Sequence, residues 1–365
     1  MRKNKITQNQ YIFIVISSMI GVGILSVASD LCKVAYQQGW ISIFIGGLYP
    51  ACIVITAAII DNKTNHASFF HVNNKIYGKI LSRIFTLIFL LYFLTIFVAI
   101  ISGFTNILRE TITRFLAPTY IILPIFILIP LISMCGIYIV GRICEFYFYL
   151  TIPLIVIPLF FITKGSIINI KPIFSSFDEI LKSTPTGIYA FSGCEISYLI
   201  ISKISNNSNT KKAGIMAASI TTCIYSFGVF ITIYYLGWEL TSKLEYPLLY
   251  LIQAMNIPII SNFTALFLFL WSLIILRTLI CISFACGDFF SELIKINYRK
   301  ANFIFLAIAL VYVFFMIPEY NRDMFLGKVI PYFVIFSFAW GLVTTILVVI
   351  KFRGGKNESF KKDKS

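Results

Sequence analysis

Apolar runs of about twenty residues recur along almost the whole chain, and they constrain the fold more than any other feature. A helix needs about 20 consecutive apolar residues to cross the hydrocarbon core of a bilayer, because each residue advances it by about 1.5 Å. Of the 365 residues, 59% are hydrophobic and 12% are charged. A soluble domain carries about 25% charged residues. The sequence therefore predicts an all-α polytopic membrane protein and excludes a soluble globular enzyme, a disordered chain and a nucleic-acid-binding domain.

Ten segments have the composition of membrane-spanning helices. They cover residues 10–29, 40–60, 83–107, 120–140, 143–162, 185–202, 213–236, 263–285, 301–317 and 328–350. The sixth is the weakest, because it is short and contains both Gly193 and Glu195. We treat residues 1–365 as a single integral membrane domain that ends in a basic tail over residues 351–365.

The distribution of basic residues predicts how the chain is oriented. There are 30 lysines and arginines against 15 aspartates and glutamates. With the N-terminus inside, 20 basic residues fall on internal segments and 9, among them Arg322, on external ones. Cytoplasmic loops carry the excess of Lys and Arg in membrane proteins, so we expect both termini to be cytoplasmic. We expect the basic tail to meet anionic membrane lipid rather than nucleic acid.

The eight cysteines lie mostly inside apolar runs, and none forms a CxxC pair. We therefore expect small packing residues rather than a disulfide framework or a zinc site. Glycine-rich phosphate loops, zinc-protease motifs and nucleophile elbows are missing from the sequence. The sequence predicts no enzyme, no catalytic residue, no cofactor and no metal.

Two of the spans carry signals of a broken helix. Gly21-Val22-Gly23 lies in the first, and Phe191-Ser192-Gly193-Cys194-Glu195 lies in the sixth. Spans one and six of ten are equivalent in a five-plus-five repeat, and transporters place binding sites at such paired breaks. Small residues also serve helix packing, but the pairing of two breaks favours the broken-helix interpretation.

A broken helix offers N–H groups that favour a carboxylate and C=O groups that favour an ammonium. An amino-acid zwitterion carries both groups, so a small amino acid suits this site better than a sugar or a lipid. The third and eighth spans would supply the side walls of the pocket, and their residues are chosen only because they lie at the same membrane depth as the breaks. The expected ligand-binding residues are Gly21, Val22, Gly23, Ile24, Val98, Phe191, Ser192, Gly193 and Thr278.

Two ionisable residues within spans carry functional predictions, because a charge in the bilayer is costly. Glu195 follows the second break, where it would either exchange a proton or hold the broken backbone through a hydrogen bond. Arg277 lies in the cytoplasmic half of the eighth span. A guanidinium stays charged, so Arg277 would replace a bound Na⁺, or else extend to the inner interface.

These residues resemble a known family. Ile20–Leu25 resembles the broken first helix of the amino acid–polyamine–organocation transporters, and Phe191–Glu195 resembles their sixth-helix F-x-G-x-E. Gln38–Ile43, followed by Gly46-Gly47, is similar to the start of helix two in the B subunit of spore nutrient germinant receptors. Tyr246-Pro247 before the eighth span also fits that family.

The resemblance implies a LeuT-like five-plus-five inverted repeat with helices one and six broken. It also implies a subunit of the spore inner membrane that senses a small nutrient and triggers germination. Its partners would be a membrane-embedded A subunit and a lipoprotein C subunit. Two alternatives stay open: a proton-coupled amino-acid permease of the cell membrane, in which Glu195 cycles its proton, and an ion-conducting subunit.

Overall fold

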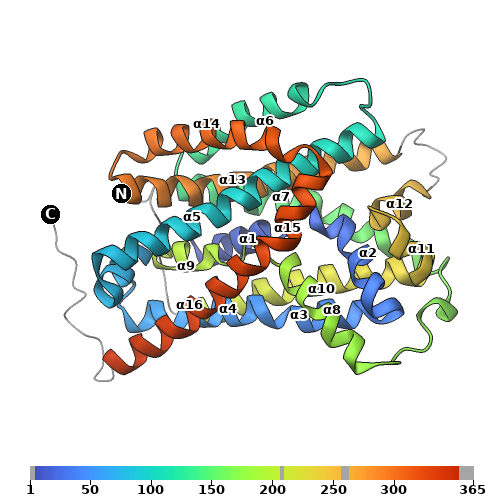
Figure 1. Cartoon of the computed structure of the whole chain (residues 1–365), viewed down its shortest axis with the longest axis horizontal. Helices are drawn as coiled ribbons and strands as arrows, with labels where there is room; N and C mark the ends of the chain where they lie inside the picture. The colour runs from blue at the N-terminus through green and yellow to red at the C-terminus, as the bar shows by residue number, and fades with distance from the viewer. Residues whose placement is uncertain (1–4, 206–208, 256–262, 353–365) are drawn as a thin grey trace.

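The computed structural model describes residues 5–205, 209–255 and 263–352, and within them the chain is almost entirely helical (Figure 1). Seven helical segments of this part of the chain are long and apolar enough to cross a membrane. They are Gly23–Lys63, Phe69–Thr111, Ile137–Phe161, Thr210–Leu236, Phe263–Ile294, Tyr298–Met316 and Glu319–Lys351. The predicted all-α, multi-span class is confirmed, whereas the count of ten spans stays a prediction.

The first expected span, 10–29, is two helices. α1 (Gln8–Met19) begins at a capping box, in which Thr7 and Gln10 exchange side-chain and backbone hydrogen bonds. It ends at Ile20, whose backbone is extended, and α2 (Gly23–Ala35) then starts. α1 is buried on every side over residues 10–19, as expected for a helix that is apolar all round. The break after α1 therefore lies in the interior of the bundle.

The sixth expected span, 185–202, is also two helices. α8 (Phe177–Ala190) starts before the expected span, because Ser176 caps it by accepting a hydrogen bond from the Glu179 N–H. α9 (Ile196–Ile200) follows after the turns at 191–195. Gly193 has a φ of +111°, and a Cβ there would overlap the carbonyl oxygen of Ser18. Only glycine permits this conformation and lets the two broken segments touch.

The other α-helices surround this centre. They are α3 (Gly39–Gly46), α4 (Leu48–Lys63), α5 (Phe69–Thr111), α6 (Pro118–Ser133), α7 (Ile137–Val156), α10 (Thr210–Leu236), α11 (Trp238–Lys243), α12 (Pro247–Gln253), α13 (Phe263–Ile294), α14 (Tyr298–Met316), α15 (Glu319–Lys328) and α16 (Ile330–Lys351).

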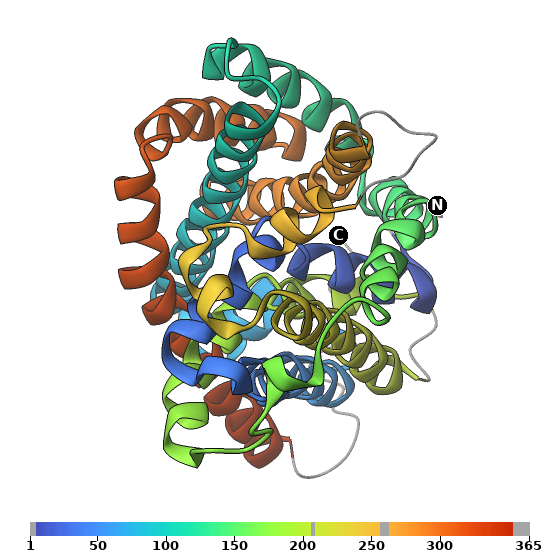
Figure 2. The ribbon, with the colours of Figure 1, turned by 90° about the vertical axis from the view of Figure 1, so that its right-hand side faces the viewer.

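Their packing leaves α1 in the middle of the molecule. α1 contacts α7, α10 and α13, while α2 packs against α8. Figure 2, viewed from the end, shows the dark blue α1 among helices coloured green, yellow-green and orange, which come from later parts of the chain. Helices from both halves of the sequence therefore meet at the two breaks.

Candidate functional site

A cavity of about 610 Å³ lies beside the two breaks. Gly21, Val22 and Gly23 of the first break line it, together with Ser192 of the second. These four residues were predicted from the sequence to bind ligand, and all four line the cavity. Gly23 leaves space there, since no atom lies within 4 Å of a Cβ built on it, whereas a Cβ on Gly21 would touch the side chain of Ile100.

The cavity has two chemically different parts. Ile96, Ala99 and Ile100 of α5 form an apolar wall, and Tyr189 of α8 and Tyr225 of α10 also line the cavity. The ionisable side chains of the lining come from α2, the 244–246 segment and α15: they are Asp30, Lys33, Glu245, Arg322 and Asp323. This arrangement suits a small ligand that combines an apolar portion with polar groups.

Side chains of two other helices hold the carbonyl groups of the first break. The Thr278 hydroxyl of α13 donates to the carbonyl oxygen of Ile20 at 2.6 Å. The Tyr225 hydroxyl of α10 donates to that of Met19 at 3.0 Å. A backbone carbonyl buried without a partner costs free energy. These two hydroxyls remove that cost, so the break is stable in the interior. Thr278 therefore supports the break and does not line the cavity.

Glu195 joins the second break to the surrounding helices. Its side chain is 1% exposed. Oε2 accepts a hydrogen bond from the Gly193 N–H at 2.8 Å, and Oε1 accepts one from the Tyr92 hydroxyl of α5 at 2.9 Å. The hydroxyls of Tyr49 on α4 and Ser337 on α16 also donate to Oε1. Four donors compensate a carboxylate for the loss of water. Of the two predicted roles, this geometry supports the one in which Glu195 holds the broken backbone.

The other predicted ligand-binding residues also lie outside the cavity lining. Ile24, Val98, Phe191 and Gly193 are buried in the packing around it. On α5 the cavity is faced by Ile96, Ala99 and Ile100, and the helical turn directs Val98 away from them. The residue of α5 chosen by depth alone is thus a neighbour of those that line the cavity, and its part in binding stays a prediction.

Arg277 also lies outside the cavity lining. It is 1% exposed and stacks against Phe148 of α7, with 5.7 Å between the guanidinium carbon and the ring centroid. Its Nε and Nη1 have no hydrogen-bond partner among the described residues. The side chain is therefore buried against α7, and its role as a fixed cation stays a prediction.

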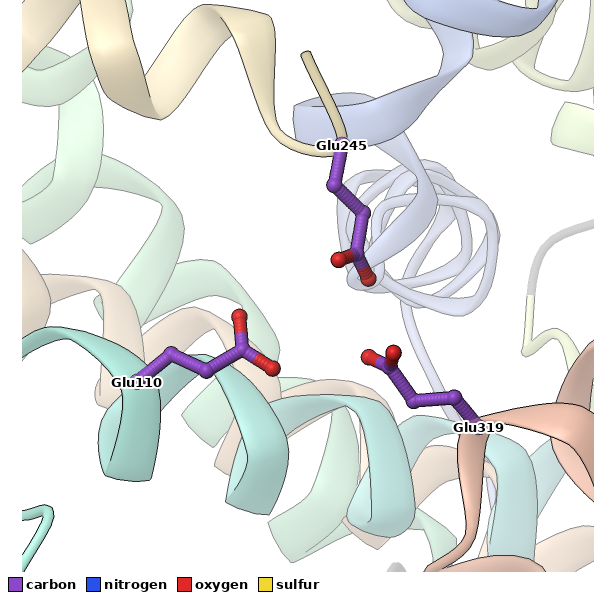
Figure 3. Close-up of side chains that lie close together, drawn as sticks. All are labelled: Glu110, Glu245 and Glu319. Atoms are coloured by element: carbon purple, nitrogen blue, oxygen red, sulfur yellow. The ribbon is translucent and has the colours of Figure 1, made fainter.

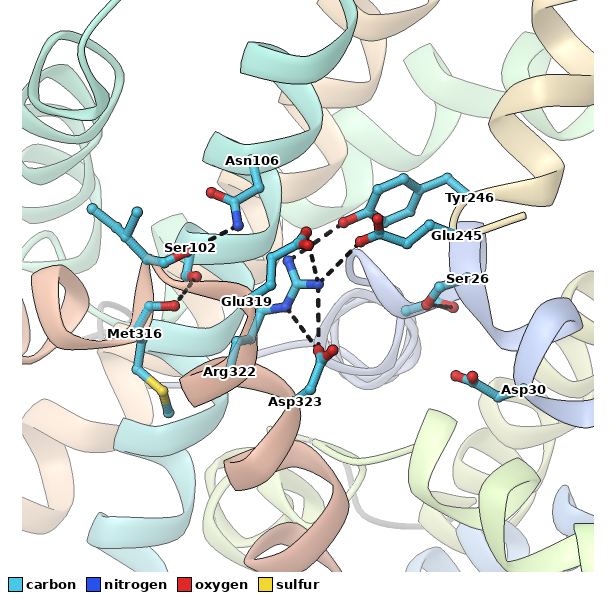
Figure 4. Close-up of polar contacts among 12 residues, drawn as sticks. Ser26, Asp30, Ser102, Asn106, Glu245, Tyr246, Met316, Glu319, Arg322 and Asp323 are labelled. Atoms are coloured by element: carbon cyan, nitrogen blue, oxygen red, sulfur yellow. Dashed lines mark hydrogen bonds and ion pairs between the residues drawn. The ribbon is translucent and has the colours of Figure 1, made fainter. Parts of the chain in front are cut away.

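Arg322 is the centre of a charged cluster at one end of the cavity (Figure 4). Its guanidinium lies 3.4 Å from both the Tyr246 hydroxyl and Glu245, 3.5 Å from Asp323 and 3.6 Å from Glu319. These contacts connect α15 to the 245–246 segment before α12. Burial raises the pKa of Tyr246, so its hydroxyl stays protonated. The cluster therefore holds α15 against the segment before α12 at this end of the cavity.

Three carboxylates face one another beside Arg322. The side chains of Glu110, Glu245 and Glu319 come from α5, the segment before α12 and α15 (Figure 3). One oxygen of each lies within 4.8 Å of the others. Like charges at this distance repel, and Arg322 offsets part of that repulsion. This end of the cavity is acidic although the chain as a whole has a net charge of +15.

Several residues of this site were not predicted from the sequence. Tyr49, Tyr92 and Ser337 hold Glu195, and Tyr225 holds the first break. Each is one polar residue in an apolar helix, a pattern that also occurs in ordinary packing. Arg322 was counted only as an external charge that helps to orient the chain.

Comparison with solved structures identifies the fold. The chain superposes with a TM-score of 0.70 on MhsT in complex with L-phenylalanine, at 14% identity over 99% of this chain and 92% of that one. It superposes with a TM-score of 0.68 on a Na⁺-coupled sialic acid symporter, at 13% identity over 96% of this chain and 79% of that one. The protein therefore has a LeuT-like, transporter-type fold, as the resemblance implied.

Comparison of sequences identifies the family. The chain is 23% identical over 360 residues to spore germination protein YndE of Bacillus subtilis (strain 168), covering 96% of this chain and 97% of the relative. It is 24% identical to spore germination protein B2 of the same organism, covering 95% of each. The family described as "Spore germination protein" matches residues 5–324. The chain therefore belongs to this spore permease family, whose members are multi-pass membrane proteins of transporter type rather than enzymes.

Proposed function

We propose that the chain is the B subunit of a spore germinant receptor, which senses a small nutrient, an amino acid, and triggers germination with an A and a C subunit. One observation carries the proposal: in a spore germination protein with a transporter fold, both broken helices meet at a single cavity. The chain's own residues supply the binding groups without a cofactor or metal. The two partner subunits rest on the resemblance of the sequence.

The ligand lies beside the first break, with its charged groups on the backbone of Gly21, Val22 and Gly23 and on Ser192. Helix ends supply these groups, since the first N–H groups of α2 point along the helix axis towards its N-terminus. The side chain of the ligand packs on Ile96 and Ile100 of α5. The structure of MhsT with L-phenylalanine supports this class of ligand, because that fold holds an amino acid.

The remaining predicted residues support the pocket without contacting the ligand. Ile24, Phe191 and Gly193 shape its backbone, Thr278 holds the carbonyl of Ile20, and Val98 packs in the core of α5. We place both termini in the cytoplasm of a ten-span, five-plus-five chain, and the acidic end of the cavity outside. The count of basic residues on the two sides supports this orientation.

Signalling follows from a shift between two arrangements of the helices. A ligand biases an equilibrium only by its difference in affinity for the two states. Moving a population from about 1:99 to 99:1 needs roughly 5.5 kcal/mol of such preference. Arg277 acts as a fixed cation in place of a bound Na⁺, so ligand binding needs no sodium. Glu195 keeps the second break attached to α4, α5 and α16 while the cavity changes shape.

A proton-coupled amino-acid permease is the second candidate. The observation that favours it is the burial of Glu195 beside the break, in a fold shared with symporters. In a permease this carboxyl would release and regain a proton in each cycle, and the ligand would cross the membrane. In a receptor the ligand binds without accumulating.

The experiment that separates the two uses the full chain in liposomes with a panel of labelled amino acids. We expect saturable, sodium-independent binding without accumulation. Accumulation that follows an imposed pH gradient would establish the permease instead. Gly23→Leu should abolish binding because its side chain fills the cavity, whereas Gly23→Ala should retain most of it. Full binding by a folded Gly23→Leu variant would place the ligand elsewhere.

A further inference from the structure

Two cysteine thiols meet in the interior of the bundle, where α7 packs against α13. Sγ of Cys144 lies 3.1 Å from Sγ of Cys281, and both side chains are fully buried. Both are free thiols. A disulfide bond is about 2.05 Å long, so an approach of roughly 1 Å would join them. The two sulfur atoms come from helices that are far apart in the sequence, so a bond between them would crosslink the bundle.

The buried cation next to these thiols is Arg277. It precedes Cys281 by one helical turn on α13, so the two share a face of that helix. The guanidinium stacks on Phe148, one turn from Cys144 on α7, and its Nε and Nη1 have no hydrogen-bond partner in the described part of the chain. A cation beside a thiol favours the thiolate, which is the form that attacks an oxidant. Arg277 would therefore activate the pair and gain a counter-charge from it.

We propose that Cys144 and Cys281 are a redox-sensitive dithiol that a hydroperoxide closes to a disulfide between α7 and α13. One thiolate attacks a peroxide oxygen, giving a sulfenic acid and hydroxide, which takes the released proton to become water. The second thiol attacks the sulfenic sulfur, the S–S bond forms and a second water leaves. The two thiols together lose two electrons and two protons, and hydrogen peroxide is reduced to two waters.

The position of the pair gives the disulfide an effect on the candidate site. α7 and α13 both pack against α1, the helix that ends at the first break. Cys281 follows Thr278 by about one turn, and the Thr278 hydroxyl holds the carbonyl of Ile20 at that break. A crosslink would fix the two helices that support this part of the cavity. It would restrict any rearrangement that moves α13 relative to α7, whether the protein is a receptor or a permease.

The test is made on the wild-type full chain in detergent. After treatment with hydrogen peroxide, remaining thiols are alkylated under denaturing conditions and unreduced peptides are identified by mass spectrometry. We expect a peptide pair linked through Cys144 and Cys281 that disappears with dithiothreitol. The exposed Cys52 reports that the oxidant has acted. Oxidised Cys52 together with free Cys144 and Cys281 would overturn the proposal.

Variants separate the dithiol from the other cysteines and from the cation. Cys144→Ser should abolish the link, and Cys286→Ser, which removes another buried thiol of α13, should leave it intact. Arg277→Met should slow formation of the link about tenfold, as expected when a thiolate loses its cation, and Arg277→Lys should retain most of the rate. An unchanged rate in Arg277→Met would remove the cation from the proposal. If a variant does not fold, the measurement on the wild type still shows whether Cys144 and Cys281 form a disulfide.

Discussion

Replacing Gly193 by alanine tests whether contact between the two breaks holds the fold together. The φ of +111° lies in a region that residues with a Cβ rarely adopt, at a cost of about 1–3 kcal/mol. The new methyl group would also overlap the carbonyl oxygen of Ser18, so the two broken segments would have to separate. Both effects act together, and we expect a loss of about 3 kcal/mol or more.

The assay is thermal unfolding of the purified protein in detergent, with amino-acid binding measured on the same samples. With an unfolding entropy of about 2.1 cal/mol/K per residue, a loss of about 3 kcal/mol corresponds to a fall in Tm of roughly 4 °C for a chain of 365 residues. Gly23→Ala is the matched control, because no atom lies within 4 Å of its added Cβ. It should change the stability by no more than about 1 kcal/mol. A Gly193→Ala variant that unfolds at the wild-type temperature would refute the close contact.

Three further substitutions test the polar contacts around the breaks. Glu195→Gln replaces one of the two acceptor oxygens by an NH2 donor, which then faces either the Gly193 N–H or the hydroxyls that donate to Oε1, so it should cost about 1–3 kcal/mol in thermal unfolding; a wild-type Tm would contradict this geometry. If ligand binding by the wild type, but not by Glu195→Gln, varies with pH, the carboxyl also exchanges a proton. Thr278→Val leaves the carbonyl of Ile20 unpaired and should weaken ligand binding more than it lowers Tm, because it acts at the break; an unchanged Kd would count against that role. Arg322→Gln should cost only about 1 kcal/mol, since its acidic partners are exposed, and the loss should shrink at high salt. A loss independent of salt would point to packing instead.

The sequence was sufficient for the fold class because membrane burial leaves a strong pattern. A bilayer demands long apolar helices, and breaks at membrane depth need glycine and polar residues together. Both break signals, at Gly21–Gly23 and at Phe191–Glu195, correspond to real interruptions of the helices. The helix at the expected span 185–202 begins before it, because α8 extends to Phe177 through polar residues that an apolar window ignores.

The details of the site could not be predicted because they depend on which face of a helix meets which neighbour. Val98 and Ile100 are both apolar, and only the packing of α5 shows that Ile100 lines the cavity. The hydrogen bonds from Tyr49 and Tyr92 to Glu195 join residues more than a hundred positions apart. Contacts at such separations follow from the assembled bundle rather than from local periodicity.

The structure makes the breaks interdependent, and for the proposed receptor this has a consequence for signalling. Gly193 touches Ser18 of α1, Glu195 ties the same turn to α5, and α5 supplies the apolar wall of the cavity. A ligand that moves α5 relative to the first break therefore strains a buried carboxylate whose hydrogen bonds are all made within the protein. Losing one such bond leaves a group unpaired at a cost of about 1–3 kcal/mol, which favours discrete arrangements over gradual deformation. Two-state behaviour of this kind is what a sensor needs to pass a binding event to another subunit.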